Sequence, residues 1–74
     1  MKTYIEVYFS ADGSKASLIS EKLFELGLQP TIGEHDHVYK WKESVPLSEV
    51  LKFVDRVQSK LKGTGAILKF STFR

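Results

Sequence analysis

The chain has no cysteine among its 74 residues, so neither disulfide bonds nor thiolate metal sites can stabilise its core. No apolar run approaches the length of a membrane-spanning helix, and the first nine residues alternate in polarity where a signal peptide would have an apolar block. We therefore expect a cytoplasmic protein without a membrane partner.

Disorder is equally poorly supported. Hydrophobic residues make up 42% of the chain and charged residues 27%, which is too apolar and too evenly mixed for a disordered segment. A chain of this length can bury one small core and not two. We expect a single domain over residues 1–74.

The charges are unevenly distributed along the chain. Residues 1–37 carry three lysines and six acidic residues, whereas residues 38–74 carry eight lysines and arginines and three acidic residues. Such an asymmetry is compatible with a basic face for an anionic partner, with complementarity between subunits, or with a solvated helix surface.

The middle of the chain, Gly27 to Glu43, organises the predicted fold as a β-hairpin. Its first strand is predicted over residues 28–32, and Pro30 restricts this strand to a sheet edge because proline cannot donate to a neighbouring strand. Its second strand is predicted over residues 38–43. Tyr39 and Trp41 should face the core, because the opposite face would bury two lysines.

A strand and a helix are expected on the N-terminal side of this hairpin. Residues 2–9 alternate with period two, which predicts a half-buried strand. A helix follows, with Ser14 as its expected N-cap and Gly27 as the residue that ends it. Its apolar residues at helical spacing are Ala16, Ile19, Leu23 and Leu26.

A helix and a strand are expected on the C-terminal side. Pro46 suits the first turn of the helix, and the Gly63-Thr64-Gly65 turn ends it. The last strand is predicted over residues 66–73. The helix has the clearest apolar stripe in the chain: Leu47, Val50, Leu51, Val54, Val57 and Leu61.

The element order predicts an α+β class, specifically a ferredoxin-like βαββαβ two-layer sandwich. In it, an antiparallel four-stranded sheet carries both helices on one face, which leaves the other face open. The residues expected to matter most on that open face are Tyr4, Tyr8, Lys40, Lys42, Lys69 and Phe73.

Two partners fit such a face. A second copy of the chain would make a homo-oligomer, either by covering the apolar side chains of this face or by pairing at an edge strand, and we favour this prediction. Alternatively, aromatic rings beside lysines can stack bases and hold phosphates of single-stranded RNA or DNA. The chain lacks the glycine-aromatic signature that the RNA-recognition fold has on its third strand.

The loop between the first strand and the first helix is a candidate site for a small anionic ligand. The amides of Asp12, Gly13 and Ser14 precede a helix N-terminus, where N–H groups and the helix dipole favour an anion. Turn and capping chemistry explain the same residues.

Residues 34–37, Glu-His-Asp-His, are the one cluster of potential metal ligands. His35 and His37 would point to the same side of an extended strand, but they supply only two ligands and the chain has no further histidine or cysteine. We predict a polar hairpin tip there, with no metal and no cofactor.

No residue set has the pattern of a catalytic site. No serine stands beside a histidine at a telling spacing, and no carboxylate pair has an evident reason to differ in pKa. Acylphosphatases share the predicted topology but need an asparagine and a first-loop arginine; this chain has no asparagine, and its arginines are Arg56 and Arg74. We expect a non-catalytic binding or regulatory module.

Four short stretches carry resemblances to known families. Asp12-Gly13 before a helix and Leu26-Gly27-Leu28 before an edge strand resemble the ACT type of regulatory ligand-binding domain. The GEHDHVYKW stretch at residues 33–41, with LKGTG at 61–65, is similar to small archaeal ferredoxin-like proteins. A looser similarity to the thiamine-binding ferredoxin-like family covers the general shape. These resemblances imply the fold, and they bring no site residues with them.

Overall fold

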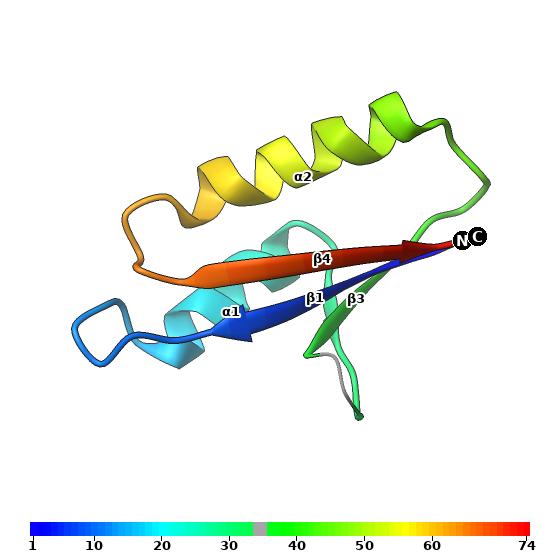
Figure 1. The fold of residues 1–74 in the computed structure, drawn as a ribbon. Coiled ribbons are helices and arrows are strands. Elements are labelled where there is room, and N and C mark those ends of the chain that lie inside the picture. Colours follow the sequence, from blue (N-terminus) through cyan, green and yellow to red (C-terminus); the bar gives the residue numbers. More distant parts are fainter. Residues whose placement is uncertain (34–35) are drawn as a thin grey trace.

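The computed structural model describes residues 1–33 and 36–74. The described elements are β1 (Lys2–Tyr8), α1 (Ala16–Glu25), β2 (Gln29–Pro30), β3 (His37–Lys40), α2 (Leu47–Leu61) and β4 (Ile67–Phe73) (Figure 1). The strands form one antiparallel sheet in the order β2-β3-β1-β4. The predicted α+β class with a four-stranded antiparallel sheet and two helices is confirmed.

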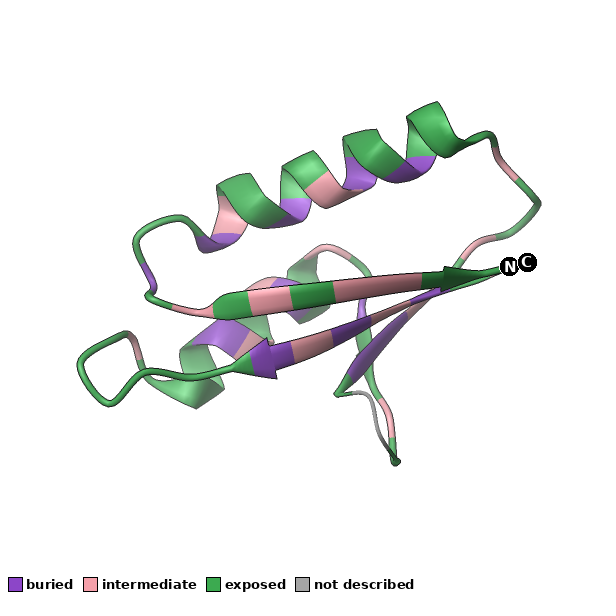
Figure 2. Cartoon of the chain, in the orientation of Figure 1, coloured by how far each residue is buried: buried purple, intermediate pink, exposed green. Residues whose placement is uncertain are grey.

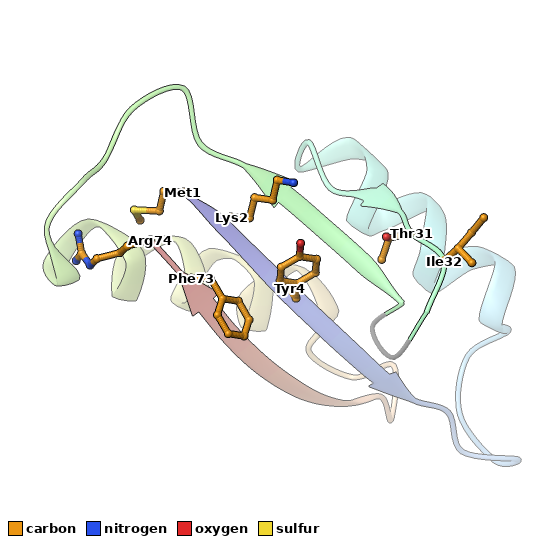
Figure 3. A pocket seen from close by; sticks show the side chains of 7 residues that line it. All are labelled: Met1, Lys2, Tyr4, Thr31, Ile32, Phe73 and Arg74. Atoms are coloured by element: carbon orange, nitrogen blue, oxygen red, sulfur yellow. The ribbon is translucent and has the colours of Figure 1, made fainter.

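Both helices pack against the same side chains of the sheet. Ile5 of β1 is fully buried, and it shares one core with Leu23 of α1 and Val57 of α2. Both helices consequently lie behind the sheet when its other face is viewed directly (Figure 3). The buried members of this core are Ile5, Val7, Ile19, Leu23, Leu28, Phe53, Val57 and Leu61.

The start of α1 differs from the prediction, whereas its end agrees. Ser14 is not the N-cap: the helix begins at Ala16, and the Ser14 amide donates to the backbone oxygen of Thr64 at 2.9 Å. Gly27 ends the helix with φ +91°, a left-handed conformation that favours glycine. The amide of Leu28 then donates to the Leu23 oxygen at 3.1 Å, and the two leucine side chains are fully buried.

The buried face of α2 is rotated from the predicted stripe. Val50, Val57 and Leu61 are buried as predicted. Leu47 and Leu51 are exposed, and Phe53 is buried in their place. The reason is geometric: Phe53 and Val57 are one turn apart and both belong to the buried side of α2, whereas Leu47 and Leu51 are exposed. The buried side of α2 is the side toward the sheet (Figure 2). Neither described helix is long and apolar enough to cross a bilayer.

The hairpin is shorter than predicted, and its expected faces are correct. β2 has two residues and bonds to β3 alone, so Pro30 lies at the edge of the sheet. Tyr39 and Trp41 pack on the core, with ring centroids 4.9 Å apart. Both rings contact Phe53, at centroid distances of 4.3 and 5.4 Å.

A short chain of polar contacts crosses the sheet beside these rings. Thr3 is fully buried, and its hydroxyl accepts a hydrogen bond from the indole N–H of Trp41 at 2.9 Å. The same hydroxyl lies 2.9 Å from that of Thr72. Polar groups of β1 and β4 and of the segment after β3 are thus satisfied inside the fold.

Candidate functional site

The face of the sheet away from the helices collects most of the predicted surface residues. Direct cross-strand partners in an antiparallel sheet point to the same face. Tyr4 lies opposite Val38 on β3 and Ser71 on β4, and Glu6 lies opposite Lys69. Lys2, Tyr4 and Phe73 are seen together on this face, which we call the open face (Figure 3).

An aromatic pair occupies one end of the open face. The rings of Tyr4 and Phe73 meet edge to face, with centroids 5.7 Å apart. Val38 beside them is buried although it does not belong to the helix-side core. A shallow hollow of about 570 Å³ lies around these rings; it is lined by Met1, Lys2, Tyr4, Thr31, Ile32, Phe73 and Arg74.

Basic side chains surround the aromatic pair. Lys2 and Lys40 are direct cross-strand partners, so two positive charges stand side by side on β1 and β3. Lys69 is placed opposite Glu6, where the two opposite charges balance. Arg74 adds a further cation at the hollow. The Tyr4 end of the open face is therefore positively charged.

Tyr8 lies at the other end of β1 and is half-exposed. Its hydroxyl donates to the Glu6 carboxylate at 3.0 Å. This hydrogen bond, together with the negative charge of Glu6, raises the pKa of the Tyr8 phenol above its ordinary value. Tyr8 therefore stays protonated and remains a flat, neutral ring.

Lys42 is the one predicted member of the open face that the sheet does not place there. β3 ends at Lys40, so the cross-strand register does not extend to Lys42, which is exposed in the following turn. The other predicted members, Tyr4, Tyr8, Lys40, Lys69 and Phe73, share the face.

The structure adds residues to the open face that the sequence reasoning missed. Lys2 and Ile67 belong to it through their partners Lys40 and Tyr8. The period-two alternation already contained this signal, because Lys2 has the same parity as Tyr4 and Ile67 the same parity as Lys69. Val38 carried the same signal, because it has the same parity as Lys40.

The amides of the predicted anion loop are occupied by the chain itself. The amide of Gly13 donates to the Ser10 backbone oxygen at 3.1 Å, and that of Asp12 to the Ser10 hydroxyl at 3.3 Å. Ser14 donates to Thr64, as described above. In this conformation these amides have no N–H left for an anion, and α1 begins two residues further on.

Of the four candidate metal ligands at residues 34–37, the structure describes Asp36 and His37. Glu34 and His35 lie outside the described residues. Asp36 accepts a hydrogen bond from the Val7 amide at 2.7 Å, which extends the pairing of the β1 and β3 segments. Within residues 1–33 and 36–74, no group of three or more histidine, aspartate or glutamate side chains is placed to hold a metal ion.

His37 is buried against α1, and a serine is beside it. Its Nε2 lies 3.2 Å from the Ser20 hydroxyl, a proximity that the sequence spacing did not reveal. Burial lowers the pKa of His37, against a smaller opposing effect of the Asp36 charge. A catalytic pair also needs a group that orients the second ring nitrogen, and Nδ1 has no hydrogen-bond partner within the described part of the chain.

The geometry thus leaves the open face as the candidate functional surface. It brings together aromatic rings, a hollow and clustered cations from three strands. Comparison with known proteins adds no assignment: no protein-family model, no curated protein and no solved structure matches this chain.

Proposed function

We propose that this chain is a non-catalytic binding module and that its open face holds single-stranded nucleic acid. The observation that carries the proposal is the Tyr4 and Phe73 pair, flanked by Lys2 and Lys40 on the exposed side of the sheet. Aromatic rings stack bases of any sequence, and lysines hold the phosphates between them.

The proposal places the domain among ferredoxin-like βαββαβ sandwiches. The order of elements and the strand order β2-β3-β1-β4 support this placement. The resemblances to small archaeal ferredoxin-like proteins and to ACT-type regulatory domains remain predictions.

The spacing along β1 supports contact with more than one nucleotide. Tyr4 and Tyr8 are four residues apart, so their side chains leave the same face about 13 Å from one another. A single nucleic-acid strand with unstacked bases can cover both rings. Ser71 on β4, directly opposite Tyr4, offers a hydroxyl group beside the Tyr4 ring.

Charge distinguishes nucleic acid from a second copy stacked on the same face. Face-to-face stacking would bring Lys2, Lys40 and Arg74 of both copies into one interface. Like charges across an interface are costly, whereas a phosphate backbone neutralises them and releases counterions. These charges support an anionic partner on the open face. Of the two homo-oligomer contacts that we predicted from sequence, the open face and an edge strand, they argue against the first.

Fluorescence anisotropy with labelled oligo-U and oligo-dT at low salt tests this function. Tyr4→Ala should weaken binding by a factor of roughly 5 to 150, which corresponds to the loss of about 1–3 kcal/mol for one base stacked on an aromatic ring. Lys40→Gln should reduce the slope of log affinity against log salt by about 0.7, the value for one phosphate contact on a single strand.

Matched controls lie on the helices. Phe24→Ala removes an exposed aromatic ring from α1, and Lys52→Gln removes an exposed lysine from α2; both variants should bind as the unmodified chain does. The proposal fails if neither oligonucleotide binds at low salt, or if Phe24→Ala and Tyr4→Ala weaken binding equally. It also fails if the chain forms a dimer that a Tyr8→Asp charge dissociates, because the open face would then be a protein interface.

A further inference from the structure

We infer that a second copy of this chain pairs with the free edge of β4, so that two sheets join into one across a two-fold axis at Phe70. The edge of β4 borders the open face and shares Ile67 and Phe73 with it. Three independent features of β4 and α2 support the inference: the outward backbone groups of β4, the order of its side chains, and an uncovered apolar flank of α2.

The backbone groups of β4 that point away from β1 can be identified from the pairing. The Asp36 amide donates to the Ile5 oxygen and the Trp41 amide to the Met1 oxygen, both at 3.1 Å, so odd-numbered residues of β1 bond toward β3. Even-numbered residues of β1 then bond toward β4. Their β4 partners are Ile67, Lys69, Ser71 and Phe73.

The remaining residues of β4 therefore direct their N–H and C=O groups outward. These residues are Leu68, Phe70 and Thr72. β4 is the last strand of the described sheet and is paired with β1 alone. An edge of this length with one charged residue and no proline is a template for another strand.

The side chains of β4 complement a second copy in one antiparallel register. With Phe70 opposite the second copy's Phe70, Ile67 meets the second copy's Phe73 at both ends of the interface. These two side chains are 68% and 56% exposed in the single chain, so pairing would cover exposed apolar surface. Lys69 meets the second copy's Ser71, which keeps the two lysines apart.

Neighbouring registers are less favourable. Centring the axis on Lys69 would put the two lysines directly opposite one another, which is destabilising. Centring it on Ser71 would put each Lys69 opposite the second copy's Phe73 and leave Ile67 without a partner. The register centred on Phe70 therefore uses the whole strand and avoids both conflicts.

The flank of α2 above this edge is apolar and uncovered. Lys60 pairs with Glu25 of α1 at 2.7 Å, so the side of α2 that carries Lys60 faces α1. Leu47 and Leu51 lie on the opposite side, which also carries Gln58 and overhangs β4. The two-fold axis would bring the same flank of the second copy's α2 against it, in the antiparallel sense.

A hollow beside β4 provides the space for this contact. Its volume is about 540 Å³, and Leu61, Ala66 and Leu68 contribute to its lining together with Gln58. Because the second copy's α2 would run in the opposite direction, its Leu47 or Leu51 would lie over this hollow. The apolar stripe of α2, wider than one core requires, is then used in full.

Cysteine cross-linking of the full chain tests both the contact and its register. The sequence has no cysteine, so an Ile67→Cys chain and a Phe73→Cys chain each carry a single thiol. In the proposed pairing these positions are a non-hydrogen-bonded pair, with Cα atoms about 4.5 Å apart, within the range for a disulfide. Two copies of residue 67 would instead lie about 20 Å apart, six residues along the strand.

A mixture of the two chains should therefore form a disulfide-linked heterodimer under mild oxidation, while either chain alone should not. The inference is overturned if the mixture gives no more cross-linked product than the single chains. In the chain without added cysteines, Leu51→Glu should convert the dimer to a monomer in sedimentation velocity. Leu18→Glu, at a similarly exposed leucine of α1, should leave the dimer in place. Equal effects of both substitutions would exclude the α2 contact.

The outcome is independent of nucleic-acid binding. Cross-linking is measured without oligonucleotide, and Lys40→Gln should leave it unchanged because Lys40 is on β3, which β1 separates from β4. Cross-linking without any oligonucleotide binding would support the edge contact and contradict the proposed function. Oligonucleotide binding without cross-linking would support the proposed function and contradict the edge contact.

Discussion

At the scale of single residues, the burial of His37 changes its pKa on folding and so makes the stability of the chain depend on pH. Its imidazole is buried beside Ser20, so its pKa lies below that of the same ring in the unfolded chain. Between these two pKa values, the unfolded chain binds a proton that the folded chain does not. The contribution of His37 to stability is therefore complete above pH 6.5, the unfolded pKa, and is lost as pH falls below it.

His37→Gln should remove this pH dependence. Chemical denaturation between neutral and mildly acidic pH should show the unmodified chain losing up to about 1.4 kcal/mol of unfolding free energy per pH unit more than the variant. Carboxylates common to both chains cancel in the difference. Parallel curves for the two chains would mean that the histidine does not titrate differently on folding.

Individual side-chain contacts differ in how far the sequence predicts them. Tyr39 and Trp41 could be assigned to the core because the alternative would bury lysines, and the structure agrees. The Ser20 and His37 contact could not be assigned, because it depends on how α1 lies over the hairpin. No spacing along the chain contains that information.

At the scale of elements, α2 shows what a periodic pattern can and cannot decide. Its length and its limits followed from Pro46 and the glycine turn, and these signals are local. Which part of the apolar arc faces the sheet is decided by packing. Phe53 is buried and Leu51 is exposed, because Tyr39 and Trp41 provide an aromatic surface for the Phe53 ring.

Truncation of two phenylalanines tests this packing. Phe53→Ala should lower the free energy of unfolding by about 3–5 kcal/mol, the usual cost of an emptied aromatic site in a core. Phe24→Ala makes the same chemical change on α1 and should change it by no more than about 0.5 kcal/mol. Phe53 is 4% exposed and Phe24 68%. Equal losses in urea denaturation would contradict the observed rotation of α2.

At the scale of the whole molecule, two loops at the same end of the fold bond to each other (Figure 1). The loop after β1 docks on the turn before β4, where the Ser14 amide bonds to Thr64. Gly13 is in contact with this turn, and a Cβ at Gly13 would overlap the backbone oxygen of Thr64. The glycine that sequence reasoning assigned to a ligand loop thus has a structural role in joining the two connections.

Gly13→Ala should therefore destabilise the whole domain. The overlap is with backbone, which cannot rotate away, so we expect a loss of about 1–3 kcal/mol in unfolding free energy, typical of overpacking. Asp12→Ala, in the same exposed loop, should be close to neutral. Thermal denaturation of both variants distinguishes them, and a neutral Gly13→Ala would show that the two loops separate without cost.

The general plan of the molecule followed from local signals, and its surfaces did not. Alternation in residues 2–9, the stop at Gly27 and the edge position of Pro30 were sufficient for an antiparallel sheet with two helices. The pairing register was needed to place Lys2 beside Lys40 and Ile67 opposite Tyr8. A surface is a property of several strands at once, so it emerges only when their register is known.

The single tryptophan gives the molecule a built-in optical reporter. Trp41 packs against Tyr39 and Phe53 and donates its indole N–H to Thr3, so its surroundings combine a helix, the central strand and the hairpin. Indole emission shifts to longer wavelength when water replaces such neighbours. The fluorescence spectrum of the unlabelled chain therefore reports whether α2, β1 and the hairpin are still assembled. It can be recorded at concentrations too low for dimerisation.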